Sequence, residues 1–209
     1  MKMQLVYTRF NRFWHWTQSA LILFLGLTGF EIHGSISFFG YENAVAYHNT
    51  AAKMFLLLIA MAIFWHFTTG AWRQYLPTMT NLRAQINYYL FGIFRNEAHP
   101  THKTPLSKLN PLQRLVYLAL KILVIPVMVL SGLLYMYFRY PQSGGIHSLN
   151  IEHLEPIALL HTAGAFFLVS FLIAHLYLIT TGTTPTSNLK AMITGYEELE
   201  TRHNEPIHH

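Results

Sequence analysis

The 209-residue chain is 52% hydrophobic and only 11% charged, whereas about a quarter of the residues in a typical soluble domain are charged. It contains no cysteine, which excludes disulfides, thiolate zinc sites, iron–sulfur clusters and covalently attached c-type haem. Thirteen histidines are an unusual number for so apolar a chain. Any metal or cofactor that the chain holds must therefore be bound through histidine.

Four apolar stretches are long enough to cross about 30 Å of hydrocarbon at about 1.5 Å per helical residue. They predict transmembrane helices at about 13–32, 46–72, 113–138 and 156–182, with a long polar connection between the second and the third. The expected fold is therefore an all-α integral membrane protein, a four-helix bundle in which residues 1–209 form a single domain.

Lysine and arginine are unevenly placed along the chain. Eleven of the 14 lie before the first span, in the long connection or after the fourth span. Because positive residues accumulate in cytoplasmic segments, we expect both termini and the long connection in the cytoplasm. The net charge of +5 is then a topology signal, and it does not indicate nucleic-acid binding. Two segments, 189–196 and 81–94, are expected to lie along the inner membrane surface.

Ionisable residues within a span are costly, so each is a functional candidate. Lys121 in the third span is expected to snorkel to the inner surface, with pairing to a haem propionate as the alternative. Five histidines also lie within spans, at two depths. The inner depth has His15, His66 and His175, and the outer depth has His48 and His161.

The most informative of these are His161 and His175 on the fourth span. Their separation of 14 residues is about 21 Å along a helix and leaves them within about 40° of one face. One helix thus offers imidazoles at two depths, as the shared helix of two stacked b-type haems must. Each iron then needs a second ligand from another helix. His48 is available at the outer depth, and His15 or His66 at the inner depth.

His15 and His66 are rivals for the inner position. A lone buried histidine is more often a hydrogen-bonded core residue, which is the simpler interpretation of His66. His15 is favoured by Gly26 and Gly29, which lie within about 20° and 40° of its face. Glycine would let a flat macrocycle approach the first span closely. Gly164 leaves similar room on the fourth span.

These residues resemble the bacterial di-haem cytochrome b subunits of membrane respiratory complexes, including those of formate dehydrogenase, nickel–iron hydrogenase and thiosulfate reductase. The resemblance covers nearly the whole chain and implies a place in the bacterial inner membrane. Its motifs are Arg-Phe-Asn-Arg-Phe-Trp-His-Trp at 9–16, His48, Leu-Asn-Pro-Leu-Gln at 109–113, the His161/His175 pair and Lys-Ala-Met-Ile-Thr-Gly at 190–195.

Ligand assignments follow from the resemblance residue by residue. It implies that His161 and His175 each give one ligand to a different haem b. His48 would complete the outer site, and His15 the inner one. With two histidines on each iron, neither haem would have an open position for substrate, so the expected task is electron transfer.

The resemblance also implies a menaquinone or ubiquinone site at the cytoplasmic side, near His175, Asn110 and Gln113. Glu31 and His33, at the far end of the first span, are the alternative polar groups at the outer side. Electrons would pass between this quinone pool and a periplasmic-side partner with an iron–sulfur cluster or multihaem c-type centre, next to a catalytic subunit. Because the chain lacks cysteine, the next carrier must belong to that partner. The resemblance thus implies an electron-transfer subunit rather than a free-standing enzyme.

Three other classes of protein use intramembrane or membrane-surface histidines. A di-iron desaturase would carry them in clustered His-x-x-His-His motifs, and none is present. A non-haem metal transporter would mix carboxylates with histidines inside its spans, which hold almost none. A six-helix transmembrane reductase of the cytochrome b561 type shares the haem chemistry but needs more spans. The visible spectrum would separate the first two from a cytochrome.

Overall fold

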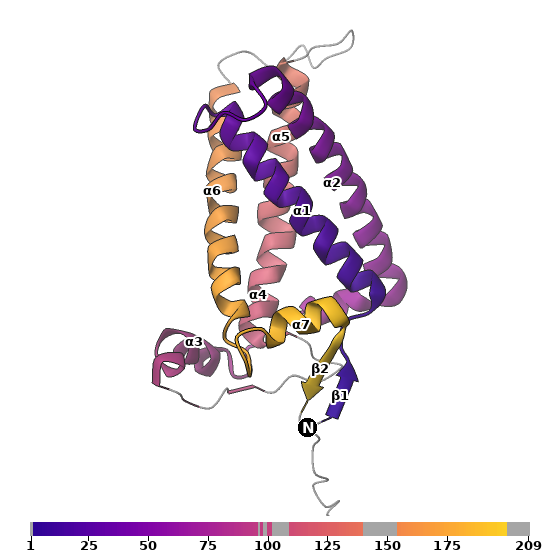
Figure 1. Ribbon diagram of the computed structural model, residues 1–209, viewed down its shortest axis with the longest axis vertical. Coiled ribbons are helices and arrows are strands. Elements are labelled where there is room, and N and C mark those ends of the chain that lie inside the picture. The colour runs from indigo at the N-terminus through magenta and orange to yellow at the C-terminus, as the bar shows by residue number, and fades with distance from the viewer. Residues whose placement is uncertain (1, 96, 98–99, 102–108, 140–153, 200–209) are drawn as a thin grey trace, which may run out of the picture. The chain divides into compact units, whose positions relative to one another are not determined.

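The computed structural model describes residues 2–95, 97, 100–101, 109–139 and 154–199 (Figure 1). The described chain is mainly helical, as the sequence predicts. Its helices are α1 (Arg9–Ile32), α2 (Tyr41–Thr69), α3 (Leu82–Leu90), α4 (Pro111–Ala119), α5 (Ile125–Arg139), α6 (Leu154–Ile179) and α7 (Ser187–Thr194), with 3₁₀ turns at Ala71–Tyr75 and Gly92–Arg95. A short pair of strands, β1 (Lys2–Leu5) and β2 (Tyr196–Leu199), was not expected in an all-α chain.

The chain divides into two compact units. The helical unit comprises Phe13–Thr69 and Ala119–Tyr177, and the terminal unit comprises Met1–Arg12, Gly70–Leu118 and Leu178–His209.

Three helices of the described chain are long and apolar enough to cross a membrane: α2, the continuous helix Pro111–Met136, and α6. An integral membrane protein built of helices is thereby confirmed. The first predicted span is also a helix, α1, of 24 residues. His15 and Gln18 in its first half lower its hydropathy, so the fourth span of the expected bundle stays a prediction.

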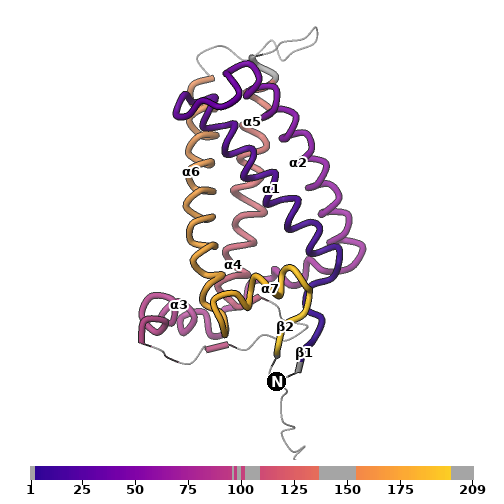
Figure 2. The backbone as a smooth tube through the Cα atoms, in the orientation of Figure 1, coloured from indigo at the N-terminus to yellow at the C-terminus, as the bar shows by residue number. Residues whose placement is uncertain are grey.

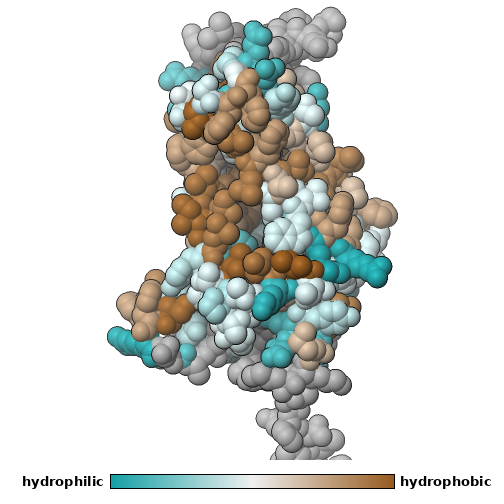
Figure 3. Space-filling view, in the orientation of Figure 1, coloured by the Kyte–Doolittle hydropathy of each residue, from teal (hydrophilic) through white to brown (hydrophobic). Residues whose placement is uncertain are grey.

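The helices of the helical unit keep large apolar side chains on their outer faces. On α6 no residue is buried, and Leu159 and Ile173 are 69% and 65% exposed. Figure 3 shows hydrophobic residues gathered over α6. In water such a surface would be a liability, whereas in lipid it is the ordinary outer face of a transmembrane helix.

The third span contains a change in helix type. Residues Leu120–Val124 form a π-helical turn between α4 and α5. Pro126 lies two residues after this turn, and since it lacks an N–H it cannot close the usual hydrogen bond to the residue four positions earlier. Wide turns of this kind are frequent at functional sites, and Lys121 lies on this one.

Glu31 fixes the connection between α1 and α2. It is only 5% exposed, and its Oε1 accepts three backbone N–H groups, from Phe38 at 2.8 Å, Phe39 at 2.7 Å and Gly40 at 2.8 Å. A carboxylate that accepts several backbone hydrogen bonds stabilises the loop that supplies them. These contacts account for Glu31 as a structural residue at the end of α1.

In the terminal unit, β1 and β2 bring the two ends of the described chain together. Lys2 pairs with Leu199 in an antiparallel register, and the two strands lie side by side in Figure 2. The C-cap of α7, Gly195, has φ +91°. A Cβ there would lie 2.7 Å from the carbonyl oxygen of Tyr7, so the close approach of these segments requires glycine.

The segment after the fourth span is helical, as its periodicity predicts. The helix α7 ends at Thr194, and Tyr196, the last residue of the segment 189–196, instead begins β2. Leu189 and Ile193 are exposed on α7, whose visible surface in Figure 3 is hydrophobic. The earlier amphipathic segment contains α3 and the 3₁₀ turn Gly92–Arg95.

Candidate functional site

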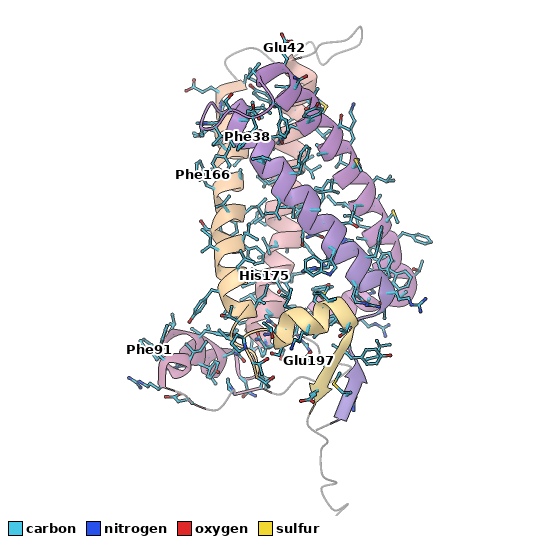
Figure 4. The ribbon with its side chains drawn as sticks, in the orientation of Figure 1. Phe38, Glu42, Phe91, Phe166, His175 and Glu197 are labelled. Atoms are coloured by element: carbon cyan, nitrogen blue, oxygen red, sulfur yellow. The ribbon has the colours of Figure 1, made fainter. Side chains whose placement is uncertain are left out.

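Four imidazoles of the helical unit form two pairs. The ring centres of His48 on α2 and His161 on α6 are 6.4 Å apart, and those of His15 on α1 and His175 on α6 are 6.3 Å apart. Figure 4 shows the side chain of His175 between α6 and α1. The structure therefore brings together, at each level of α6, the histidines that were predicted to share an iron.

The spacing of the rings fits a metal ion between them. A metal–imidazole bond of about 2.0–2.1 Å on each side, with each ring centre about 1.1 Å beyond its nitrogen, would separate two ring centres by about 6.3 Å. Among the described residues no group of three or more histidines, cysteines or carboxylates could hold a bare ion. Haem iron needs few ligands from the protein, so pairs of histidines fit haem.

The Thr28 hydroxyl lies beside Nδ1 of His48. Thr28 is fully buried, and its hydroxyl lies within hydrogen-bond distance of the carbonyls of Phe24 at 2.9 Å and Leu25 at 3.2 Å. The same oxygen lies 3.0 Å from Nδ1 of His48, where it can accept a hydrogen bond from Nδ1–H while its own proton goes to a carbonyl. That tautomer has its lone pair on Nε2, which is the form that can bind iron.

Ser131 does the same for His161. Its buried hydroxyl donates to the carbonyl of Val127 at 2.6 Å and lies 3.0 Å from Nδ1 of His161. The hydroxyl can again accept from Nδ1–H, which suits the tautomer of His161 with its lone pair on Nε2. The two histidines of this level are thus held in the same way by two different helices.

The pair formed by His15 and His175 has different surroundings. Nδ1 of His15 is buried and has no hydrogen-bond partner among the described residues. The His15 ring meets the edge of Trp16 at 5.1 Å between centres. Phe171, one turn before His175, stacks on it at 5.8 Å with an angle of 17° between planes. Aromatic rings, rather than hydroxyls, orient the imidazoles at this level.

His66, the rival inner ligand, is hydrogen-bonded through both ring nitrogens. Its Nδ1 lies 2.6 Å from the carbonyl of Ala62, which can only accept, so Nδ1 carries the proton. Its Nε2 then accepts from the ammonium of Lys121 at 3.3 Å. The Lys121 ammonium also lies 5.5 Å from the ring centre of Trp14, a cation–π distance. This is the arrangement expected of a hydrogen-bonded core histidine.

Asn110 and Gln113, the predicted quinone residues, lie in the terminal unit and cap α4. The side-chain oxygen Oδ1 of Asn110 accepts a hydrogen bond from the backbone N–H of Gln113 at 2.8 Å. The side-chain oxygen Oε1 of Gln113 accepts one from the backbone N–H of Asn110 at 3.1 Å. This reciprocal pair is a capping box. The Asn110 amide also donates to the hydroxyl of Tyr89 at 3.0 Å. Burial raises the pKa of Tyr89 above its ordinary value, so this hydroxyl stays protonated at neutral pH.

Glycines lie against both histidines of the His48–His161 level. A Cβ at Gly29 would meet Cε1 of His48 at 3.6 Å, and one at Gly132 would meet Cε1 of His161 at 3.0 Å. Gly29, which the sequence places near the face of His15, thus lies against the ring of His48. The room expected beside Gly164 is instead filled by the sulfur of Met128, which a Cβ there would overlap. At Gly26 a Cβ would meet nothing within 4 Å.

Gly132→Ala is expected to weaken binding of the haem that His161 would hold. The new methyl group would press on the His161 ring, and overpacking of this kind costs about 1–3 kcal/mol. Haem retention on dilution in detergent, followed by absorbance, would measure the loss. Leu130→Ala is the control, because Leu130 is 60% exposed on the same helix. Equal haem retention in the two variants would contradict the placement of Gly132.

Thr28, Ser131 and Gly132 were not among the residues predicted for the site. The signal that could have found them is a hydroxyl residue followed by glycine inside an apolar span, at Thr28-Gly29 and again at Ser131-Gly132. Hydroxyls in membrane helices usually bond their own backbone, so the pattern gains meaning only once the neighbouring histidine is known.

Comparison with known proteins agrees with the geometry. The family model of the prokaryotic cytochrome b561 family matches residues 6–195. The chain is also 31% identical over 199 residues to "Putative cytochrome YdhU" of Escherichia coli (strain K12), an alignment that covers 91% of this chain and 73% of that protein. No solved structure shows a significant match. The resemblance to bacterial membrane cytochromes b is confirmed. The chain therefore belongs to the prokaryotic cytochrome b561 family, whose members are haem b-binding membrane proteins of electron transfer.

Proposed function

We propose that this protein is the di-haem cytochrome b subunit of a quinone-linked respiratory complex in the bacterial inner membrane. The observation that carries the proposal is the pair of imidazole pairs, with ring centres 6.4 and 6.3 Å apart, that share α6. His48 and His161 would hold one haem, and His15 and His175 the other. Bound haem supplies one-electron transfer.

The residues around each iron would exclude other chemistry. Two imidazoles would hold each haem, so neither haem would have a position left for oxygen or a substrate. Apolar side chains of the surrounding helices keep water away and thereby influence the reduction potential. The sequence separation of 14 between His161 and His175 would set the two levels about 21 Å apart along the helix axis. This chain would thus conduct electrons across the membrane without performing chemistry on a substrate.

Quinone would bind on the cytoplasmic side near Asn110 and Gln113. The amide of Asn110 is tied to the Tyr89 hydroxyl, and this neutral pair offers donor and acceptor groups of the kind that a quinone or quinol needs. The capping box that holds Asn110 keeps the amide in a fixed position. Both termini would lie in the cytoplasm, and a periplasmic-side partner would supply the iron–sulfur or c-type haem centre that a cysteine-free chain cannot hold.

The absorption spectrum tests the function. Protein purified in mild detergent should show the sharp reduced α band of low-spin haem b and should be reduced by a quinol analogue in membranes. A colourless preparation would contradict the assignment and leave the metal-transporter alternative. A spectrum of high-spin haem that binds carbon monoxide at both sites would contradict ligation of each iron by two histidines.

A further inference from the structure

The hydroxyl–glycine pairs Thr28-Gly29 and Ser131-Gly132 have the same relation to a histidine of another helix. In each case the hydroxyl lies 3.0 Å from Nδ1 of the imidazole. The following glycine lies against Cε1 of the same ring, so that a Cβ would come within 3.6 Å of His48 or 3.0 Å of His161. The two arrangements come from different helices, α1 and α5, and from different hydroxyl residues.

The hydrogen bonds also run in the same direction. Each hydroxyl donates to the carbonyl four residues earlier, at 2.9 Å for Thr28 and 2.6 Å for Ser131. The carbonyls of Leu25 and Met128, three residues before each hydroxyl, are further acceptors for the same protons, at 3.2 and 3.3 Å. Each hydroxyl thus has carbonyl acceptors for its proton and can accept from an imidazole N–H with its oxygen. Both arrangements therefore suit an imidazole that carries its proton on Nδ1.

We propose that Thr28-Gly29 and Ser131-Gly132 form matched cradles that position His48 and His161 as iron ligands. The cradles also set how strongly these two imidazoles bind the iron of the haem that they would share. The glycine admits the ring against the helix backbone, and the hydroxyl fixes the Nδ1–H tautomer, so that Nε2 is presented to the iron. A hydrogen bond from the distal N–H makes the ligating nitrogen more basic. More basic ligands favour ferric iron and lower the reduction potential.

The effect is confined to one level of the bundle. Nδ1 of His15 has no hydrogen-bond partner among the described residues, and aromatic rings contact His15 and His175 instead. The cradles thus distinguish the two haems chemically, and removing them changes one haem alone. The inference rests on the proposed function, since it assumes that His48 and His161 share a haem.

The test is a redox titration of the intact protein in detergent. The step that disappears in His48→Ala belongs to the haem that His48 would hold, and it is this step whose potential is followed. Thr28→Val keeps the shape of threonine and removes the hydroxyl, and Ser131→Ala does the same for serine. In the double variant the reduction equilibrium constant of that haem is expected to rise about tenfold, equivalent to about 59 mV for one electron. The reduction potential of the other haem should not change. The single variant Thr28→Ser, which keeps a hydroxyl at this position, should have the wild-type potentials at both haems.

Ser170→Ala is the matched control. Ser170 lies on α6 and donates to the carbonyl of Phe166 at 3.0 Å, so it is a hydroxyl in a span with no imidazole contact. Unchanged reduction potentials in the double variant, or an equal shift in Ser170→Ala, would contradict the proposed role of the two cradles. A shift of the same size in both haems would contradict it as well.

A second measurement has a readout other than electron transfer. In the fully reduced protein low-spin iron is diamagnetic, and the ring N–H protons of histidine can be followed by NMR. Those of His48 and His161 are expected at Nδ1 and in slow exchange with water, with fast exchange at His48 in Thr28→Val. If either of these two rings carries its proton on Nε2 in the wild-type protein, the proposed role of the cradles is wrong. Purified protein without haem would instead refute the proposed function, and the same NMR experiment on that protein would still decide the tautomers.

Discussion

His15→Ala is expected to remove one of the two haems, whereas His66→Ala should keep both. Both histidines lie at the same predicted depth, but only His15 has a ring partner at iron-bridging distance, the 6.3 Å to His175. Both nitrogens of His66 are already engaged, by the Ala62 carbonyl and the Lys121 ammonium. Removal of an axial ligand leaves a five-coordinate iron that is held weakly, so haem content should fall from two to about one per chain.

Pyridine haemochrome assays of the two variants, with protein measured by amino-acid analysis, would decide between the histidines. His33→Ala is the matched control for histidine loss, because His33 is exposed beyond the end of α1. Loss of a haem in His66→Ala with two haems retained in His15→Ala would reassign the inner site to α2 and α6. The aromatic contacts of His15 with Trp16 would then have only a packing role.

Asn110→Ser is expected to slow reduction of the haems by a quinol analogue about tenfold, which is about 1.4 kcal/mol in the barrier. Serine caps a helix about as well as asparagine, so the N-terminus of α4 should persist. It lacks the amide that donates to Tyr89, so the hydrogen-bonding pair proposed to meet the quinol is lost. Stopped-flow reduction in membranes would measure the rate, and thermal unfolding would report stability.

Asn110→Leu separates the two roles of this residue. It loses both the amide and the cap, and loss of an N-cap costs about 0.5–2 kcal/mol, so this variant should be slow and also less stable. A wild-type rate in Asn110→Ser would leave Asn110 with capping alone. A large defect in His33→Ala beside that result would move the quinone to the outer end of the bundle. Glu31 is a poor probe of that end, since its carboxylate holds the loop after α1.

The helices and the histidine pairs could be anticipated because each depends on spacing within one helix. A separation of 14 residues fixes both the depth and the direction of His161 relative to His175, whatever packs around them. Sequence could not choose between His15 and His66 as easily, since both are polar residues at the same depth. The choice depends on contacts from other helices, above all the hydrogen bond from Lys121 to His66.

Other features depend on contacts between distant residues and left little trace in the sequence. β1 pairs with β2, which lies more than 190 residues later. The four residues of β1 alternate polar and apolar side chains, but the four residues of β2, Tyr-Glu-Glu-Leu, do not, and so short a pattern does not indicate a strand pair. The cradles at Thr28 and Ser131 need the partner histidine to be recognised. The capping box is the exception, because Asn110 and Gln113 have the spacing of a capping pair. The family resemblance predicts a quinone site at these two residues, whereas their spacing alone predicts that they cap a helix.

The number of haems per polypeptide tests the central claim most directly. Two depth-matched histidine pairs on a shared helix predict two protohaems for each chain, both low-spin, in protein purified in mild detergent. A pyridine haemochrome assay on protein quantified by amino-acid analysis gives the ratio. A value near two is the expected result, and a redox titration should then resolve two one-electron steps. A value near one, in protein that has lost no haem during purification, would contradict the account, because one of the two pairs would then have no iron to hold.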